Sequence, residues 1–409
     1  MILHCDCNCF YASVEMCENP SLRGKKVAVC GSTENRHGIV LTASYPAKRC
    51  GIRTGMTNGE AKALCPDLIM VPPRYELYLR YSRDVAAILR QYSDLVEPYG
   101  MDENWLCLPG ERDVAGAGAA LAETLRRRMR EEIGITVSIG VSFNKVFAKL
   151  GSDMKKPDAQ TILTRENYRE RVWPLPASDL LWVGRATARK LALRGVQTIG
   201  ELAAVPPERL RSWFGVNGLM LWRYANGLDD ARVAPQDYSA PILSVGHGTT
   251  CRCDLHENRE VWQVLYALSQ DVGHRLRQAK LLARGVQVAV RDDLLDWRQV
   301  QAPLPAPSRS PLELSQAAFD LFRARYGWFR PIRALTIRGI QLTGEAAPMQ
   351  LDFWQDAERR ARQRRLDDAV DELRRRFGAG AIRAASLMGE GLLAQDRCEI
   401  VPIPGMMVR

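Results

Sequence analysis

The stretch ILHCDCNCFYASVE, residues 2–15, begins as an apolar run and ends in a pattern typical of a helix start. We predict a strand over 2–8 and a turn that leads into a helix from Phe10. Asp6 interrupts the apolar run, and an unpaired carboxylate is costly to bury. Asp6 is therefore the first candidate for a functional residue in this chain.

A second acidic site lies in the segment YGMDENWL, residues 99–106, where Asp102 and Glu103 occupy a turn between two strands predicted within 95–108. Hard divalent cations such as Mg²⁺ need clustered carboxylate oxygens, and phosphoryl transfer uses two such ions. Together with Asp6, this pair could form such a site. On these residues alone, an Asp at a strand end and a solvated acidic turn explain the pattern more simply.

Strands and helices alternate through the first 157 residues. Besides the opening strand, the pattern predicts strands over 26–30, 38–43 and 136–141 and helices over 75–92, 119–133 and 144–154. This alternation indicates an α/β or α+β layer domain that ends near Pro157. Short helices separated by Gly and Pro follow over 175–227, and 233–241 has the composition of a linker.

A second strand-rich region follows this linker. Over 242–343 we predict the order strand, helix, strand, strand, helix, strand, with helices at 261–278 and near 312–325 and a Pro-rich connection between them. The region carries 14 Lys and Arg against 9 Asp and Glu, so it holds +5 of the chain's net charge of +10. A basic, strand-rich module is a reasonable surface for duplex nucleic acid.

The composition is that of an ordinary soluble protein, with 46% hydrophobic and 25% charged residues among 409. The sequence contains no run of about 18 apolar residues and does not start like a secretory signal. Eleven cysteines without any Cys-x-x-Cys are expected to be reduced thiols. Cys5, Cys7 and Cys9 indicate small buried residues rather than zinc ligands. We expect a cytoplasmic protein without membrane association.

Five segments, in order along residues 1–343, resemble motifs of the Y-family DNA polymerases, most of all the bacterial DNA polymerase IV branch. The segments are 6–15, Met101-Asp102-Glu103, TASYPAK at 42–48, SIGVSFNKVFAK with SDMKKP over 138–157, and Leu180–Gly200. The family implies an α+β multidomain fold shaped like a right hand. Its parts would be palm and small fingers at 1–165 (fingers about 20–72), a helix-hairpin-helix thumb at 166–232, the linker 233–241, a little-finger DNA-binding domain at 242–343 and a basic tail at 344–409.

The resemblance also implies roles for individual residues. Asp6, Asp102 and Glu103 would hold two Mg²⁺ ions together with the main-chain carbonyl of Cys7, and Glu103 or its water would help deprotonate the primer 3′-hydroxyl. Tyr11 would be a steric gate whose ring excludes a ribose 2′-hydroxyl and so selects deoxynucleotides. Positive charge and hydrogen-bond donors would also hold the triphosphate. The residues implied in binding the deoxynucleoside triphosphate besides Tyr11 are Phe10, Thr42, Tyr45, Lys48 and Lys156.

Several positions depart from the family pattern. Asn8 stands where a second Asp is common, Gly100 where Ser is usual, and Asn104-Trp105 where Ala and an aromatic residue are usual. Lys48 replaces a common Arg, which loses a bidentate phosphate contact but keeps the charge. None of these changes removes a matched metal ligand, so we expect activity. Without the family, Tyr45 would instead be interpreted as a packed aromatic residue.

Two further motifs concern macromolecular partners. In the thumb, Gly184, Gly195 and Gly200 match hairpin positions that bind DNA phosphates through main-chain N–H groups, although Trp182 stands where Gly is usual. A plain helical connection is the alternative. In the tail, residues 350–354 resemble the peptide by which bacterial polymerases bind the sliding clamp, and a buried helix start is the alternative. The clamp contacts would be Gln350, Leu351, Phe353 and Trp354.

The tail also contains an apolar stripe at helical spacing, flanked by arginines. A partner-docking or DNA-facing helix and a solvated basic helix are both compatible with this pattern. The stripe consists of Leu366, Ala369, Val370, Leu373 and Phe377.

The family implies a template-directed DNA polymerase of low fidelity that bypasses lesions in DNA repair and damage tolerance. We expect it to act as a monomer on primer–template DNA and deoxynucleoside triphosphates, with the sliding clamp as a partner and without proofreading. One rival is another palm-type nucleotidyl transferase, such as a nucleotide cyclase, against which the thumb hairpin and the basic module argue. The other is a non-enzymatic DNA binder whose site has decayed through Asn8 and Gly100, against which the intact Asp6, Asp102 and Glu103 argue.

Overall fold

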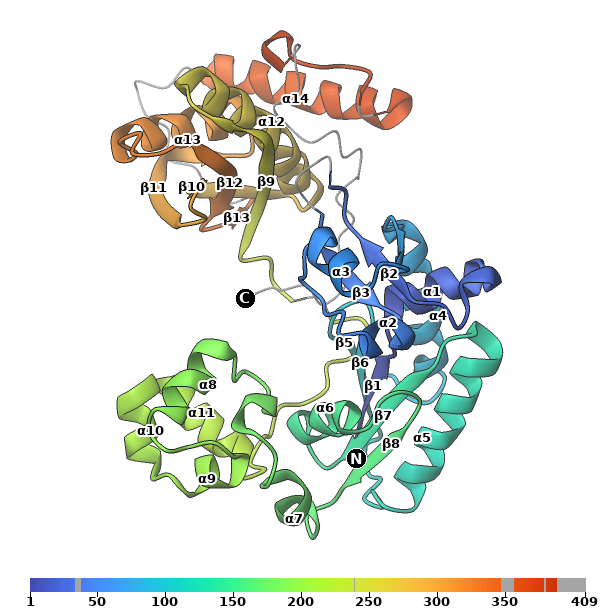
Figure 1. Ribbon diagram of the computed structural model, residues 1–409. Coiled ribbons are helices and arrows are strands. Elements are labelled where there is room, and N and C mark those ends of the chain that lie inside the picture. Colours follow the sequence, from blue (N-terminus) through green and yellow to red (C-terminus); the bar gives the residue numbers. More distant parts are fainter. Residues whose placement is uncertain (34–37, 239, 347–356, 379, 388–409) are drawn as a thin grey trace. The chain divides into compact units, whose positions relative to one another are not determined.

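The structure, a computed structural model, describes residues 1–33, 38–238, 240–346, 357–378 and 380–387. These residues divide into two compact units, one made mainly of 1–31 and 39–238 and the other mainly of 240–387. Each unit has its own hydrophobic core. In Figure 1 the first unit runs from blue to green and the second from yellow to red. Helices and sheets mix in both, as expected for the α+β multidomain class.

A five-stranded sheet with β1 at its centre forms the middle of the first unit. Its order is β5-β6-β1-β7-β8, and all pairs are antiparallel except β7–β8. All six residues of β1 are buried, so a carboxylate on this strand is held inside the protein. The strands are β1 Ile2–Cys7, β5 Val96–Pro98, β6 Glu103–Cys107, β7 Val137–Ser142 and β8 Gln160–Leu163.

Different helices cover the two faces of this sheet. Gly140 of β7 allows α6 to approach one face closely, because a Cβ there would lie 1.8 Å from the carbonyl oxygen of Ala148. His4 pairs with Gly140 across β1 and β7, so His4 and Asp6, two residues further on, face α6. The odd-numbered residues of β1 enter the core on the other face. The helices are α6 Lys145–Met154 on the first face and α1 Phe10–Glu18, α4 Tyr75–Arg90 and α5 Ala117–Arg128 (with a π-helical turn at Met129–Ile133) on the second.

The cysteines near the N-terminus behave as predicted. Cys5, Cys7 and Cys9 are buried free thiols, and the first two pack in the core on the face opposite Asp6. In the part of the chain that the structure describes, no helix is long and apolar enough to cross a membrane.

A small second sheet with two short helices forms the region predicted as fingers. Its order is β3-β2-β4. Thr57 and Glu60 form a reciprocal capping box that fixes the start of α3. The elements are the 3₁₀ turn Pro20–Leu22, β2 Val27–Cys30, β3 Val40–Ala43, α2 Tyr45–Arg49, α3 Asn58–Leu64 and β4 Ile69–Val71.

Short helices follow the first sheet, in the region predicted as thumb, and share a hydrophobic core with α6 and β8 of the sheet domain. Asn144 also joins the two parts, because its Nδ2 donates to the main-chain oxygen of Gly227 at 3.1 Å. Trp173 Nε1 donates to Ala225 O at 3.1 Å within the helical region. The elements are α7 Tyr168–Val172, the 3₁₀ turn Ala177–Asp179, α8 Arg185–Ala192, α9 Ile199–Ala204, α10 Pro207–Phe214 and α11 Val216–Ala225.

The first part of the predicted linker 233–241 is attached to the first unit. Val233 is buried beside Trp105. The N–H of Ala234 donates to Glu97 Oε2 at 2.8 Å, and that of Gln236 donates to Asp94 O at 3.0 Å. Over 233–236 the chain is therefore held on the sheet domain by an apolar contact and two hydrogen bonds.

The second unit is a four-stranded antiparallel sheet covered on one face by two helices. Its order is β11-β10-β12-β9, and a short strand, β13, also pairs with β10. Alternate residues Val286, Val288 and Val290 of β10 are buried against the helices. The elements are β9 Ser244–Leu255, α12 Asn258–Gln278, β10 Leu281–Asp292, β11 Trp297–Ser308, α13 Pro311–Arg325, β12 Ile332–Ile340 and β13 Thr343–Gly344.

The predicted order strand, helix, strand, strand, helix, strand is confirmed, but the Pro-rich stretch expected as a connection lies within the strand β11. Three prolines lie in it, at 303, 305 and 307. Proline cannot donate a ladder hydrogen bond, but β11 is an edge strand, where only one side of the strand needs donors. Low strand propensity is thus tolerated at this edge.

The tail helix α14, Ala357–Phe377, packs on the helical side of the second unit through its polar face. Arg277 of α12 binds both carboxylate oxygens of Asp371, at 2.6 and 2.8 Å. Arg360 binds both oxygens of Glu313 in α13, at 2.8 and 2.9 Å. The 3₁₀ turn Ala385–Leu387 follows and contacts α12.

The apolar stripe of α14 lies to one side of this docked face. Leu366 is 55% exposed and Phe377 is 71% exposed. Successive residues of a helix are about 100° apart, so the stripe lies roughly a third of a turn from the Arg360–Asp371 face. The helix is therefore neither wholly solvated nor docked through its apolar residues.

Candidate active site

Two of the predicted acidic residues meet across the centre of the first sheet. Asp6 of β1 and Glu103 of β6 are direct partners in the antiparallel ladder, so their side chains share the face covered by α6. Asp102 immediately precedes β6, and its main-chain oxygen accepts the N–H of Cys7 at 2.9 Å. The ends of two neighbouring strands thus bring Asp6, Asp102 and Glu103 to one place, although nearly a hundred residues separate them in sequence.

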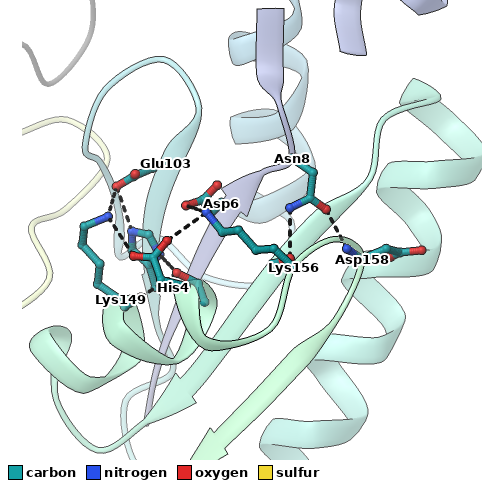
Figure 2. A network of polar contacts seen from close by, with 10 residues as sticks. His4, Asp6, Asn8, Glu103, Lys149, Lys156 and Asp158 are labelled. Carbon is teal, nitrogen blue, oxygen red and sulfur yellow. Dashed lines mark hydrogen bonds and ion pairs between the residues drawn. The ribbon is translucent and has the colours of Figure 1, made fainter. Parts of the chain in front are cut away.

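Asp6 is paired with a lysine that comes from the loop after α6. Lys156 Nζ lies 2.6 Å from Asp6 Oδ2 and 2.9 Å from Asp153 Oδ1 (Figure 2). Asp6 is only 5% exposed. A buried carboxylate needs such a partner, because an isolated charge is strongly disfavoured away from water.

Glu103 is paired with a second lysine and a buried histidine. Lys149 Nζ lies 2.6 Å from Glu103 Oε2, and His4 Nε2 lies 3.4 Å from the same oxygen (Figure 2). Ser152 Oγ donates to the carbonyl of Lys149 at 2.7 Å and is 2.9 Å from His4 Nδ1. The histidine ring is thereby fixed beneath the carboxylates.

The three carboxyl groups differ in how easily they ionise. Burial raises the pKa of Asp6 to about 7 in spite of the neighbouring Lys156. Burial and the charge of Glu103 also raise the pKa of Asp102. Burial opposes ionisation of Glu103 as well, but His4 and Lys149 outweigh it and lower the pKa of Glu103 to about 2. Asp6 and Asp102 thus lack sufficient neutralising charge, which a cation would supply.

The chemistry of this cluster suits Mg²⁺. In the described ranges, no three His, Cys, Asp or Glu side chains converge as a ready-made metal site. Two of the predicted ligands, Asp6 and Glu103, are instead paired with Lys156 and Lys149, and for Asp6 this pairing does not offset the effect of burial. The donors are hard carboxylate oxygens, and burial raises the pKa of Asp6 and Asp102, an effect that the positive charge of a divalent ion would oppose.

Cys7 can contribute only its main chain to this cluster. Its side chain is 2% exposed and packs in the core on the opposite face of β1. Its N–H is bonded to Asp102 O. A role for Cys7 is thus restricted to its carbonyl, as the family implies.

Tyr11 belongs to a rigid aromatic cluster at the start of α1. Its ring stacks on Tyr78 with centroids 4.4 Å apart and an interplanar angle of 15°. Tyr78 is fully buried and donates through its hydroxyl to Glu15 Oε1 at 2.7 Å, which Arg74 Nε also binds at 3.0 Å. The ring of Phe10, by contrast, is 3% exposed and packs in the core, so only the main chain of Phe10 is available to a nucleotide.

The predicted triphosphate residues of the fingers lie in α2 and on the strand before it. Lys48 is exposed, and its Nζ lies 5.0 Å from the ring centroid of Tyr45. Tyr45 Oη is buried and has no hydrogen-bond partner among the described residues. A buried hydroxyl without a partner is unfavourable, which is consistent with a ligand acceptor at this position. Thr42 is half-buried on β3, three residues earlier.

The departures from the family pattern have structural explanations. Asn8 Nδ2 donates to Ser138 Oγ at 2.9 Å, and Asn8 Oδ1 accepts the N–H of Asp158 at 2.7 Å. Asn8 therefore ties β1 to β7 and to the loop that carries Lys156. Gly100 has φ +107, a conformation that side chains rarely adopt, so the turn before the acidic pair is shaped for glycine.

Trp105, the other departure, packs beside the acidic residues. Its ring lies 4.8 Å from that of Tyr99 and 5.2 Å from that of His4, and its Nε1 donates to Lys145 O at 3.1 Å. It thus forms part of the wall behind His4.

The three predicted DNA-binding glycines of the thumb have different surroundings. Gly184 precedes α8, and Gly195 follows it with φ +78; a Cβ at either position would meet nothing within 4 Å. Gly200 lies inside α9, where a Cβ would be 2.9 Å from the Cβ of Trp173. Close packing is thus a sufficient reason for glycine at 200. Trp182 adopts φ +73, a conformation usually taken by glycine.

The predicted clamp-binding residues lie outside the described residues, within 347–356. Sequence reasoning did not single out His4, Lys149 or Asp153. A usable signal existed for His4, because it lies two residues before Asp6 in a strand and must share its face. Lys149 could not be assigned this way, since its contact with Glu103 depends on how α6 crosses the sheet.

The sequence matches three models of protein families. The impB/mucB/samB family model matches residues 5–153, the model of that family's C-terminal domain matches 243–353, and the thumb-domain model of DNA polymerase-iota matches 178–229. DNA polymerase IV of Acetivibrio thermocellus is 43% identical over 397 residues, which cover 97% of this chain and 98% of that protein. DNA polymerase IV of Moorella thermoacetica is 39% identical over 396 residues, covering 96% and 97%. DNA polymerase IV 1 of Bacillus subtilis is 36% identical over 391 residues, covering 95% and 93%.

A solved structure has the same fold. A Y-family DNA polymerase chimera, Dbh-Dpo4-Dbh, superposes with a TM-score of 0.74 over 83% of this chain and 98% of that chain, at 22% sequence identity. The chain therefore belongs to the Y family of DNA polymerases and is a DNA-directed DNA polymerase. Within the family it is similar to the branch whose members are named DNA polymerase IV, as its motifs predicted. Neither rival interpretation, a nucleotide cyclase or a non-enzymatic DNA binder, is supported.

Proposed function

We propose that this polymerase extends a primer by two-metal phosphoryl transfer, with low fidelity and without proofreading, and that it copies past lesions. The observation that carries the proposal is the pairing of Asp6 with Glu103 at the centre of the palm sheet, next to Asp102. When bound there, two Mg²⁺ ions would activate the primer 3′-hydroxyl and stabilise the charge on the leaving pyrophosphate. Asp6, Asp102, Glu103 and the carbonyl of Cys7 are the groups proposed to hold them.

Nucleotide binding is proposed to draw Lys156 away from Asp6. Its ammonium is engaged by Asp6 Oδ2 at 2.6 Å and by Asp153 Oδ1 at 2.9 Å, so its charge is already largely balanced before a triphosphate binds. A triphosphate offers several negative oxygens, and Lys156 is only partly buried, so the exchange is electrostatically reasonable. Tyr45 and Lys48 would hold the triphosphate from the fingers, with Thr42 beside them, and release of Lys156 would leave Asp6 free to bind a metal ion.

Tolerance of lesions is proposed to follow from the small fingers. A three-stranded sheet and two helices of five and seven residues provide little surface to press on a nascent base pair. All helices and strands of the described residues are assigned to the proposed palm, fingers, thumb, little finger and tail helix. None of them remains to form a separate exonuclease domain in these ranges.

Primer–template DNA is proposed to bind at the thumb hairpin and at the open face of the little-finger sheet. The exposed main chain near Gly184 and Gly195 supports the first contact. The register of β10 and β12 puts Gln287 and Arg338 opposite each other on the face away from the buried Val286 and Val288, which supports the second.

The function is tested by primer extension. With Mg²⁺ the full chain is expected to extend a DNA primer on an undamaged template and past an abasic site, and a chelator should abolish both reactions. Incubation without nucleotides should leave the primer intact. Shortening of the primer would contradict the absence of proofreading, and a block at the abasic site, with normal extension elsewhere, would contradict lesion bypass.

We further propose that Gln350, Leu351, Phe353 and Trp354 bind the sliding clamp. Tethering raises the effective concentration of the primer end and so lengthens each product. Alanine at all four positions should leave extension on short templates unchanged and remove stimulation by a loaded clamp, measured as product length on primed circular DNA. A double variant at Leu366 and Phe377, exposed apolar residues of the same tail, serves as the matched control and should retain stimulation. Stimulation that survives the fourfold change would place the clamp contact elsewhere.

A further inference from the structure

We propose that Lys149 is a positioning residue that holds one oxygen of Glu103 and so presents the other oxygen to a metal ion. The inference rests on the proposed function, in which Glu103 is a metal ligand. It assigns to Lys149, with His4 beneath it, a role in deciding how Glu103 binds metal and which metal the site prefers.

The two oxygens of Glu103 have different surroundings. Lys149 Nζ is 2.6 Å from Oε2, and His4 Nε2 is 3.4 Å from the same oxygen. The hydrogen bond of Lys149 goes to Oε2, and no hydrogen bond to Oε1 is found among the described residues. One oxygen is thus held from the side of α6, while the other is left for a ligand.

The position of the Lys149 ammonium is set by the packing of α6 on the sheet. The side chain of Lys149 is 15% exposed, and its Nζ also lies 5.5 Å from the ring centroid of Tyr99. The carbonyl of Lys149 accepts the Ser152 hydroxyl, which in turn is bonded to His4. Helix, histidine and carboxylate therefore form one buried network that keeps Glu103 in one orientation.

Lys149 differs in this respect from Lys156, the other lysine of the site. Lys156 lies in the loop after α6, and its side chain is 28% exposed and shared between Asp6 and Asp153. Such a group can exchange one partner for another. Lys149 is anchored within a helix, and its described acidic neighbours are Glu103 at 2.6 Å and Asp153 at 3.9 Å. Lys149 is therefore placed to stay with Glu103 when a metal ion binds.

A carboxylate held by one oxygen favours Mg²⁺ over Ca²⁺. Mg²⁺ requires near-octahedral geometry and short bonds, which suit single-oxygen ligands, whereas the larger Ca²⁺ readily accepts both oxygens of one carboxylate. If Lys149 is removed, Oε2 becomes available and Glu103 can bind through both oxygens. The relative affinity should then shift toward Ca²⁺.

The test compares Lys149→Met with Lys145→Met in the full chain. Lys145 is a close match, because it lies in the same helix, is 12% exposed and pairs with a partly buried acid, Glu97, at 2.7 Å.

Removing a group that orients a metal ligand typically costs about 10–100-fold in activity or metal affinity. We expect Lys149→Met to lower kcat with Mg²⁺ by that factor and to leave KM for the nucleotide within about threefold. Calorimetric titration of nucleotide-free protein with Mg²⁺ and Ca²⁺ should show the Ca²⁺/Mg²⁺ affinity ratio raised by about tenfold. Lys145→Met should change none of these.

Lys149→Arg separates positioning from simple neutralisation of charge. A guanidinium keeps the charge but binds a carboxylate through a two-pronged fork, which would engage both oxygens of Glu103. Positioning therefore predicts that Arg does not restore kcat, whereas a purely electrostatic role predicts that it does. The inference would be overturned if Lys149→Arg restored kcat and kept the wild-type Ca²⁺/Mg²⁺ affinity ratio. It would also be overturned if Lys149→Met left that ratio unchanged.

Asp102→Ala distinguishes a failure of this inference from a failure of the proposed function. If metal binding in the titration does not depend on Asp102, the carboxylate cluster is not the metal site and the proposed function fails with it. If binding depends on Asp102 while the Lys149→Met ratio stays at the wild-type value, only the role of Lys149 is wrong. Melting temperatures of the variants, measured beside the titrations, show whether each protein is folded.

Discussion

Asp102→Ala is expected to abolish nucleotide incorporation while leaving a folded protein that still binds primer–template DNA. Loss of one group that stabilises the transition state commonly lowers kcat by about 10²–10³-fold, and a ligand of both metal ions should matter at least as much. The measurement is single-turnover incorporation at saturating DNA and nucleotide.

The same substitution should not destabilise the protein. Burial and Glu103 raise the pKa of Asp102 above that of an unfolded chain. At neutral pH, which is above the unfolded value, the ionised form therefore lowers the free energy of unfolding, and this penalty disappears as pH falls. The melting temperature of Asp102→Ala in metal-free buffer should equal or exceed that of the wild type.

The matched control is Asp94→Ala, a change of the same kind at an exposed position just before β5. It should retain wild-type incorporation, because Asp94 accepts the N–H of Gln236 through its main-chain oxygen, and Ala preserves that hydrogen bond. Robust incorporation by Asp102→Ala would refute the two-metal assignment. A low melting temperature would mean that Asp102 supports the fold rather than the chemistry.

Tyr11→Ala is expected to increase the use of ribonucleotides relative to deoxynucleotides. The ring is held against Tyr78, which Glu15 and Arg74 fix in turn, so it forms a wall that cannot easily yield to an extra 2′-hydroxyl. A pocket wall discriminates against one added group by roughly 10–10²-fold, and this is the change expected in the ratio of kcat/KM values. Single-nucleotide incorporation with both sugars gives the ratio directly.

Two variants accompany this measurement. Tyr11→Phe keeps the ring and should keep the wild-type ratio, because the hydroxyl, whose pKa burial raises to about 12, carries no charge at neutral pH. Tyr75→Ala removes a neighbouring ring, 6.1 Å from that of Tyr11, and controls for general loosening of the aromatic cluster. If Tyr75→Ala changes the ratio as much as Tyr11→Ala does, sugar selection belongs to the cluster and not to Tyr11 itself.

Much of the fold was predictable because its signals are local. Alternating apolar residues in 2–8 and 136–141 and helical spacing in 75–92 correspond to β1, β7 and α4. The order of elements over 242–343 was predicted correctly, but the Pro-rich stretch was expected to be a connection, since proline is unfavourable in a strand unless the strand lies at an edge. Edge position is a property of the assembled sheet and cannot be read from the segment.

The sequence by itself determined which acids, aromatic residues and lysines are candidates for the chemistry. Residue type and order along the chain carry that information, as the motifs containing Asp6, Tyr11 and Asp102 show. Only the tertiary structure decided that the ring of Phe10 belongs to the core and that Lys149 binds one oxygen of Glu103, with His4 beside that oxygen. These outcomes depend on strand register and on the close approach of α6 at Gly140. Both arise from packing between segments far apart in sequence, and packing is decided by the whole chain.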